Sequence, residues 1–139
     1  MNLFYSINGK RTAESPKVSF FDQSFLRGDG VFEVVRILNG GKLRAIQLHL
    51  DRLESSAKQI SYPFPSRSAI QQWLQEAAEA GGEGNVRLLA TNGDPSDLNT
   101  TPPTVFISWS PLPESFITAN NRSLACCWLM EEYSEMVVL

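Results

Sequence analysis

The hydrophobic pattern of the chain changes from strand-like to helical and back, and this order limits the fold more than any other feature. Residues 31–38 form a run rich in β-branched side chains, which is typical of a strand. Across residues 46–60, apolar side chains recur every three or four positions, the spacing of a helix with one buried stripe. Strand-like runs return at 86–91 and 105–109. The pattern predicts an α+β domain with a largely antiparallel sheet and two helices.

Turn and capping residues mark the ends of several predicted elements. Ser66 is placed to cap a second helix, which Gly81-Gly82 would end. Asn8-Gly9 is a favoured hairpin turn after the strand-like run at 3–7, and we expect residues 18–21 to supply the partner strand.

Length and composition indicate a globular domain and argue against nucleic-acid and membrane partners. The chain has 139 residues, of which 42% are apolar and 19% charged, and this is ordinary for a globular protein. We expect one domain at 1–113 and a divergent or truncated tail at 114–139. The net charge of -3 without a basic block argues against a nucleic-acid partner. No signal peptide and no apolar run of about 20 residues is present, so we expect no membrane partner and a cytoplasmic location.

Metal binding has little support in the sequence. His49 is the single histidine, and the two cysteines, Cys126 and Cys127, are adjacent without a further His or Cys ligand nearby. We therefore predict no metal site. A role for His49 as a base or in positioning a cofactor stays open, although hydrogen bonds at the helix end are the more frequent arrangement.

Arg52 is a candidate ligand for an anion such as phosphate. It lies at the edge of the buried stripe, within the first two turns of the predicted helix. There, free backbone N–H groups and the helix dipole favour an anion, and a guanidinium can bind phosphate through two hydrogen bonds. The local pattern alone nevertheless favours a solvated arginine paired with Asp51 or Glu54.

Three charged residues lie within predicted strands. Glu33 and Arg36 are three positions apart and therefore face opposite sides, and Glu33 shares its face with Val31 and Val35. We expect one of the two to be half-buried. Arg87 interrupts an apolar strand, which requires either an exposed strand end or a paired anion.

Together these residues resemble the fold-type IV pyridoxal-phosphate enzymes, which include branched-chain and D-amino-acid aminotransferases and 4-amino-4-deoxychorismate lyase. The resemblance covers about residues 3–110. It rests on Asp22, the run RGDGVFEVVR at 27–36, the run HLDRL at 49–53 with Ser56-Ala57, and the runs VRLL at 86–89 and TNG at 91–93.

The resemblance implies a role for several residues. Arg52 corresponds to the arginine that holds the phosphate of pyridoxal 5'-phosphate. This correspondence favours a phosphate ligand over the solvated, paired arginine that the local pattern favours. Phe32 falls at an aromatic wall of the substrate pocket, and Arg87 where branched-chain members recognise a dicarboxylate. Arg27 occupies a position near the substrate that is usually Tyr or Phe, so it would bring a positive charge there. Phe32 and Asn92 replace a tyrosine and an arginine of D-amino-acid aminotransferases, which argues against that specificity.

One departure concerns catalysis. The family places its Schiff-base lysine in a second domain, and none of the four lysines here matches it: Lys10, Lys17, Lys42 and Lys58. We therefore expect the small N-terminal domain of an enzyme acting on amino acids or keto acids, inactive alone. It would bind the cofactor phosphate and part of the substrate, and the resemblance implies a homo-oligomer. A non-catalytic binding or dimerisation remnant and a 4-amino-4-deoxychorismate lyase-like protein remain alternatives.

Overall fold

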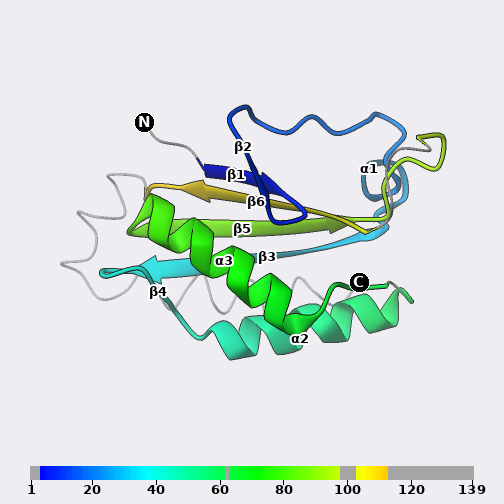
Figure 1. The fold of residues 1–139 in the computed structure, drawn as a ribbon. Helices are drawn as coiled ribbons and strands as arrows, with labels where there is room; N and C mark the ends of the chain where they lie inside the picture. Colours follow the sequence, from blue (N-terminus) through cyan, green and yellow to red (C-terminus); the bar gives the residue numbers. More distant parts are fainter. Residues whose placement is uncertain (1–3, 62, 98–102, 113–139) are drawn as a thin grey trace.

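A computed structural model describes residues 4–61, 63–97 and 103–112 (Figure 1). The predicted tail at 114–139 and the two cysteines lie outside these residues. The elements are β1 (Phe4–Ile7), β2 (Lys10–Thr12), α1 (Gln23–Arg27), β3 (Gly30–Leu38), β4 (Lys42–Leu43), α2 (Ile46–Gln59), α3 (Arg67–Gly81), β5 (Gly84–Thr91) and β6 (Thr104–Ser110). The predicted α+β class is confirmed.

The strands form one six-stranded sheet with the order β2-β1-β6-β5-β3-β4. All five neighbouring pairs are antiparallel, and β3 pairs with β5 along eight residue pairs, from Gly30–Thr91 to Ile37–Gly84. In Figure 1, α3 crosses one face of the sheet and α2 lies below it, next to β3 and β4. Among the described elements, no helix covers the opposite face, which we call the open face.

The core lies between the sheet and the two long helices. Alternate residues of each central strand turn toward the helices, so each strand contributes every second side chain. The largest fully buried apolar side chains from both layers are Val35, Ile37, Leu50, Leu53, Ile70, Leu74, Val86, Leu88, Val105 and Ile107. This packing fixes which side chains of β3 and β5 reach the open face.

The two predicted helices are confirmed together with their ends. Ser66 caps α3, since its Oγ accepts a hydrogen bond from the Ala69 N–H. The α3 helix ends at Gly81, and its C-cap residue Gly82 has a φ of 77°. The α2 helix buries Leu50, Leu53 and Ala57, the stripe that the periodicity indicates.

The predicted partner of the first strand is wrong. Asn8 and Gly9 both have positive φ, 48° and 76°, so the turn closes in two residues and the chain pairs back at once. Tyr5 therefore faces Thr12 in β2, and residues 18–21 form no strand. The β2 strand has only three residues, all polar, and so carries no alternating pattern.

A third, short helix was not predicted. The α1 helix has five residues and buries none of them, so it has no apolar periodicity. Asp22 caps it by accepting a hydrogen bond from the Ser24 N–H at 2.8 Å, and Gly28 ends it in the left-handed conformation.

Candidate functional site

Glu33 is a carboxylate within the helix-covered face of the sheet, and it holds Arg52. The alternation of β3 places Glu33 beside Val31 and Val35, and its side chain is only 4% exposed. Arg52 Nε donates to Glu33 Oε1 and Nη2 donates to Oε2, each at 2.6 Å. A planar guanidinium and a carboxylate match in this two-bond geometry, which fixes orientation as well as distance. Of the two strand charges, Glu33 is thus the buried one.

His49 contacts the same carboxylate. Its Nδ1 lies 2.7 Å from Glu33 Oε2, and because an ionised carboxylate can only accept, the ring donates its Nδ1–H there. The expectation that helix-end hydrogen bonds satisfy this ring is therefore wrong. Three residues apart on α2, His49 and Arg52 lie on one side of the helix and both reach β3.

The electrostatics of this cluster favour ionised Glu33. Burial of the carboxyl raises the pKa of Glu33, but the hydrogen bonds and charges of Arg52 and His49 outweigh burial and lower that pKa below its ordinary value. The Glu33 carboxylate in turn raises the pKa of Arg52. The pair is therefore ionised at neutral pH.

The rest of the Arg52 guanidinium is available to a ligand. Its side chain is 52% exposed, and within the described part of the chain Nη1 has no hydrogen-bond partner. The pairing with Asp51 or Glu54 that the local pattern favours is wrong, because both carboxylates bind Arg67 instead. An arginine whose Nε and Nη2 are bound to one buried carboxylate, and whose Nη1 is free, can donate hydrogen bonds to a phosphate group.

Phe32 and Arg87 lie on the open face. Phe32 is adjacent to Glu33 and so points to the opposite side of β3, where it is 58% exposed. It pairs with Leu89, and Arg87 is two residues before Leu89 on β5. The structure therefore brings Phe32 and Arg87 onto one surface and puts Arg52 on the other side of β3.

The outer edge of β3 connects these two surfaces. Within the described residues, β4 pairs only with Ile37 and Leu38, and the Arg44 N–H donates to the Arg36 carbonyl. No strand pairs with the outer edge of β3 over residues 30–35. Arg52 lies on the helix-covered side of this edge, and Phe32 lies on the open face. Unpaired edges are also where proteins bind further chain segments.

Arg27 lies apart from the other three predicted residues. It is exposed at the end of α1, and no hydrogen bond or ion pair is recorded for it in the described part of the chain. Its role near a substrate stays a prediction.

The α1 segment is tied to the loop that follows β5. Thr91 Oγ1 donates to buried Asp22 at 2.8 Å, and Asn92 Nδ2 donates to Asp29 at 2.9 Å. The Gln23 N–H also donates to the Gly93 carbonyl. These bonds fix both segments at the same end of the sheet.

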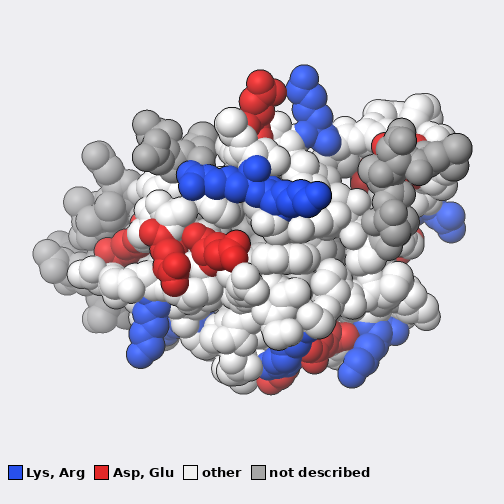
Figure 2. All heavy atoms as spheres, in the orientation of Figure 1, with Lys and Arg blue, Asp and Glu red and all other residues white. Residues whose placement is uncertain are grey.

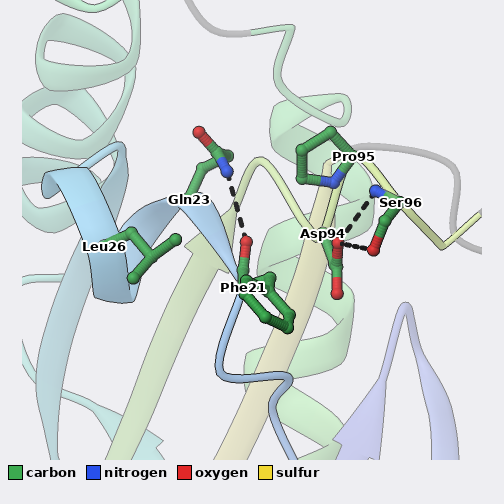
Figure 3. Close-up of a pocket in the computed structure, with 6 residues that line it drawn as sticks. All are labelled: Phe21, Gln23, Leu26, Asp94, Pro95 and Ser96. Carbon is green, nitrogen blue, oxygen red and sulfur yellow. Dashed lines mark hydrogen bonds between the residues drawn. The ribbon is translucent and has the colours of Figure 1, made fainter.

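A hollow of about 340 Å³ lies at this end (Figure 3). It is lined by Phe21, Gln23, Leu26, Asp94, Pro95 and Ser96. Hydrogen bonds from Ser19 and Ser96 lower the pKa of Asp94, and the Gln23 side-chain amide donates to the Phe21 carbonyl. Its polar groups thus bind one another, and it contains none of the four predicted site residues.

Other classes of site have no support in the described residues. Acidic side chains gather over α3 and basic ones over the strands above it, so neither sign dominates the face seen in Figure 2. No group of three or more His, Cys, Asp or Glu side chains there could hold a metal ion. None of the described helices is long and apolar enough to cross a membrane.

Glu33 is the site residue that the sequence interpretation did not include. A signal existed, because a carboxylate between two core valines must find a buried partner. Its partner could not be read from the sequence, since Arg52 lies 19 residues away.

Comparison with known proteins agrees with the fold. Residues 30–135 match the family described as "Amino-transferase class IV". The chain is 34% identical over 114 residues to a D-alanine aminotransferase of Listeria monocytogenes, covering 80% of the chain and 37% of that protein. It is 29% identical over 116 residues to a bifunctional aminodeoxychorismate lyase / D-amino acid transaminase of Mycobacterium tuberculosis, covering 78% and 38%.

A solved structure is similar over the same region. It is a hypothetical aminotransferase from Mycobacterium tuberculosis in its PLP-bound form, with a TM-score of 0.71 and 26% sequence identity. The similarity covers 87% of this chain and 44% of that one. The chain thus spans about two fifths of the length of these proteins.

Proposed function

Because the chain belongs to the amino-transferase class IV family, we propose that it binds the phosphate of pyridoxal 5'-phosphate and part of an amino acid or keto acid substrate. Arg52 is the phosphate ligand. Glu33 and His49 are positioning residues, since they act through Arg52. Phe32, Arg87 and Arg27 are the substrate-binding residues.

The observation that carries this proposal is the Arg52–Glu33 pair. Two hydrogen bonds to a buried carboxylate fix the guanidinium plane, so binding a phosphate costs little further side-chain ordering. The buried Glu33 carboxylate lies on the protein side of the guanidinium, and the free N–H groups lie on its solvent side. A phosphate that binds from solvent is therefore closer to these donors than to the carboxylate.

When bound, the cofactor would supply an electron sink for bond changes at the substrate α-carbon. The residues of this chain would hold its phosphate and present an aromatic wall and a cation across the edge of β3. None of the four lysines stands at the family's catalytic position, so we assign no catalytic residue to residues 1–139. A homo-oligomer and a lyase reaction are further possibilities that the family resemblance supports.

Binding of pyridoxamine 5'-phosphate to the 139-residue chain tests this function. This ligand has the phosphate but lacks the aldehyde, so it forms no random adducts with the surface lysines. We expect binding measurable by calorimetry, weakened about 10- to 100-fold in Arg52→Met. Lys58→Met, which removes a cation from the end of the same helix, is the matched control and should bind normally.

The alternative is a binding or dimerisation remnant without a cofactor site. In that case pyridoxamine 5'-phosphate would not bind, or would bind equally to the wild type and to Arg52→Met. Either result would overturn the assignment of Arg52.

A further inference from the structure

The dipeptide Asn-Gly occurs three times in the sequence, as Asn8-Gly9, Asn39-Gly40 and Asn92-Gly93. In such a pair the backbone nitrogen of the glycine can attack the side-chain amide carbon of the asparagine, because glycine has no Cβ to obstruct the approach. The attack requires an asparagine side chain that is free to turn and a glycine N–H without another partner. The contacts around each pair therefore determine whether it can react.

Asn39 and Gly40 lie in the exposed turn between β3 and β4 (Figure 1). The Gly41 N–H closes this turn by donating to the Leu38 carbonyl at 3.1 Å, a bond that uses neither reacting group. Within the described residues, the Asn39 side chain and the Gly40 N–H have no hydrogen-bond partner. A Cβ at Gly40 would meet nothing within 4 Å, so the space around its nitrogen is open. Both reacting groups are therefore free.

The pair Asn92-Gly93 is held at both reacting groups. Asn92 Nδ2 donates to Asp29 at 2.9 Å, and the Gly93 N–H donates to Thr91 Oγ1 at 3.0 Å. Gly93 is also buried, and its carbonyl accepts from the Gln23 N–H. An attack by the Gly93 nitrogen would require both side-chain bonds to break, and a buried amide that loses its partner is costly. The fold thus protects this pair.

The pair Asn8-Gly9 is held through its side-chain amide. Asn8 Oδ1 accepts from the Val105 N–H at 2.8 Å, and the Asn8 N–H donates to the Val105 carbonyl at 2.8 Å. Gly9 packs so closely on Trp73 that a Cβ at Gly9 would overlap the indole ring. Turning the Asn8 amide toward the Gly9 nitrogen breaks its bond to Val105. This pair is therefore protected as well.

We propose that Asn39 is a site of spontaneous deamidation, and that the fold protects Asn8 and Asn92 from the same reaction. The Gly40 nitrogen forms a bond to Asn39 Cγ and loses its proton, while the Cγ–Nδ2 bond breaks and ammonia leaves. Water then opens the resulting cyclic imide at one of its two carbonyl carbons. Addition at Cγ yields aspartate, and addition at the backbone carbonyl carbon yields isoaspartate, whose main chain runs through Cγ.

The modification changes the turn and leaves the phosphate site intact. Both products add a negative charge to the turn, and isoaspartate also lengthens the backbone that aligns β4 with β3. Glu33 lies six positions before Asn39, about 20 Å along β3. The reaction is thus independent of the proposed function, and pyridoxamine 5'-phosphate binding has no bearing on it.

Incubation of the full chain at mildly alkaline pH, followed by peptide mapping with mass spectrometry, tests the proposal. Alkaline solution speeds the reaction because the deprotonated backbone nitrogen is the nucleophile. We expect Asn39 to convert to aspartate and isoaspartate about ten-fold or more faster than Asn8 or Asn92, since each of these must first lose a hydrogen bond. In urea that unfolds the chain, the three pairs should react at similar rates, because the fold no longer protects two of them.

Thr91→Val and Thr91→Ser form a matched pair of variants. Thr91→Val removes the acceptor of the Gly93 N–H and should speed the reaction at Asn92 about three-fold or more, without changing the rate at Asn39. Thr91→Ser keeps the hydroxyl group and should change neither rate, and urea unfolding shows that both variants fold. Equal rates at the three pairs of the folded wild type, or an Asn39 that reacts only in urea, would overturn the proposal.

Discussion

Arg52 and Glu33 lie 19 residues apart in sequence, and two hydrogen bonds of 2.6 Å join them. This pair links α2 to the edge of β3 and leaves the outer side of the guanidinium exposed. The same carboxylate also holds His49. One buried acid thus orients two polar side chains of α2, His49 and Arg52.

We expect Glu33→Gln to lower the free energy of unfolding by about 2 kcal/mol at pH 7, because it removes a charge-assisted pair. It should also weaken pyridoxamine 5'-phosphate binding, since Arg52 loses its fixed orientation. Urea unfolding and calorimetry measure the two effects. A variant with normal stability and normal affinity would show that Glu33 does not position Arg52.

The effect of Glu33 on stability should depend on pH. Since the folded-state pKa of Glu33 lies below its ordinary value of 4.5, the ionised group stabilises the fold fully above pH 4.5. This contribution is lost as the pH falls through the folded-state pKa. Unfolding free energies of wild type and Glu33→Gln should therefore converge on acidification, whereas Glu79→Gln serves as a surface control. A difference that stays constant to pH 3 would contradict this account.

Gly9→Ala should destabilise the fold through a specific contact. A Cβ atom at Gly9 would lie 2.2 Å from Trp73 Nε1, and Gly9 also has a φ of +76°. Gly40 has a similar φ of +84°, but a Cβ there would meet nothing within 4 Å. Gly9→Ala should thus cost about 1–3 kcal/mol more than Gly40→Ala. Equal losses in thermal or urea unfolding would mean that the hairpin does not pack on α3.

Ser6→Ala should stabilise the protein. Within the described residues, the Ser6 hydroxyl is buried without a hydrogen-bond partner, and a group of this kind costs free energy on folding. Removing it should raise the free energy of unfolding by about 1 kcal/mol. A loss of stability in urea unfolding would indicate that the hydroxyl is satisfied in solution.

Strong local signals made part of the fold predictable. The β-branched run of β3, the helical period of α2 and the Ser66 cap of α3 each act within a few residues, and the structure confirms them. The β2 strand and α1 were missed for the opposite reason. Both are short and have few buried side chains, so hydrogen bonds to neighbouring segments rather than hydrophobic pattern determine them.

The site was predictable only in part. The sequence placed Phe32 and Arg87 in two predicted strands, but the pairing of these strands and the common surface of the two residues depend on the β3–β5 register, which aligns Phe32 with Leu89. The partner of Arg52 depends on how α2 packs against β3. Long-range contacts of this kind leave no local signal.

The most direct test of the assignment of Arg52 is a thermodynamic cycle in which the ligand phosphate and the Arg52 guanidinium are removed separately and together. The affinities of pyridoxamine 5'-phosphate and pyridoxamine are measured by calorimetry for the wild type and Arg52→Met. If Arg52 holds the phosphate, the phosphate strengthens binding about 10- to 100-fold in the wild type and far less in the variant. An equal phosphate effect in both proteins would contradict the account.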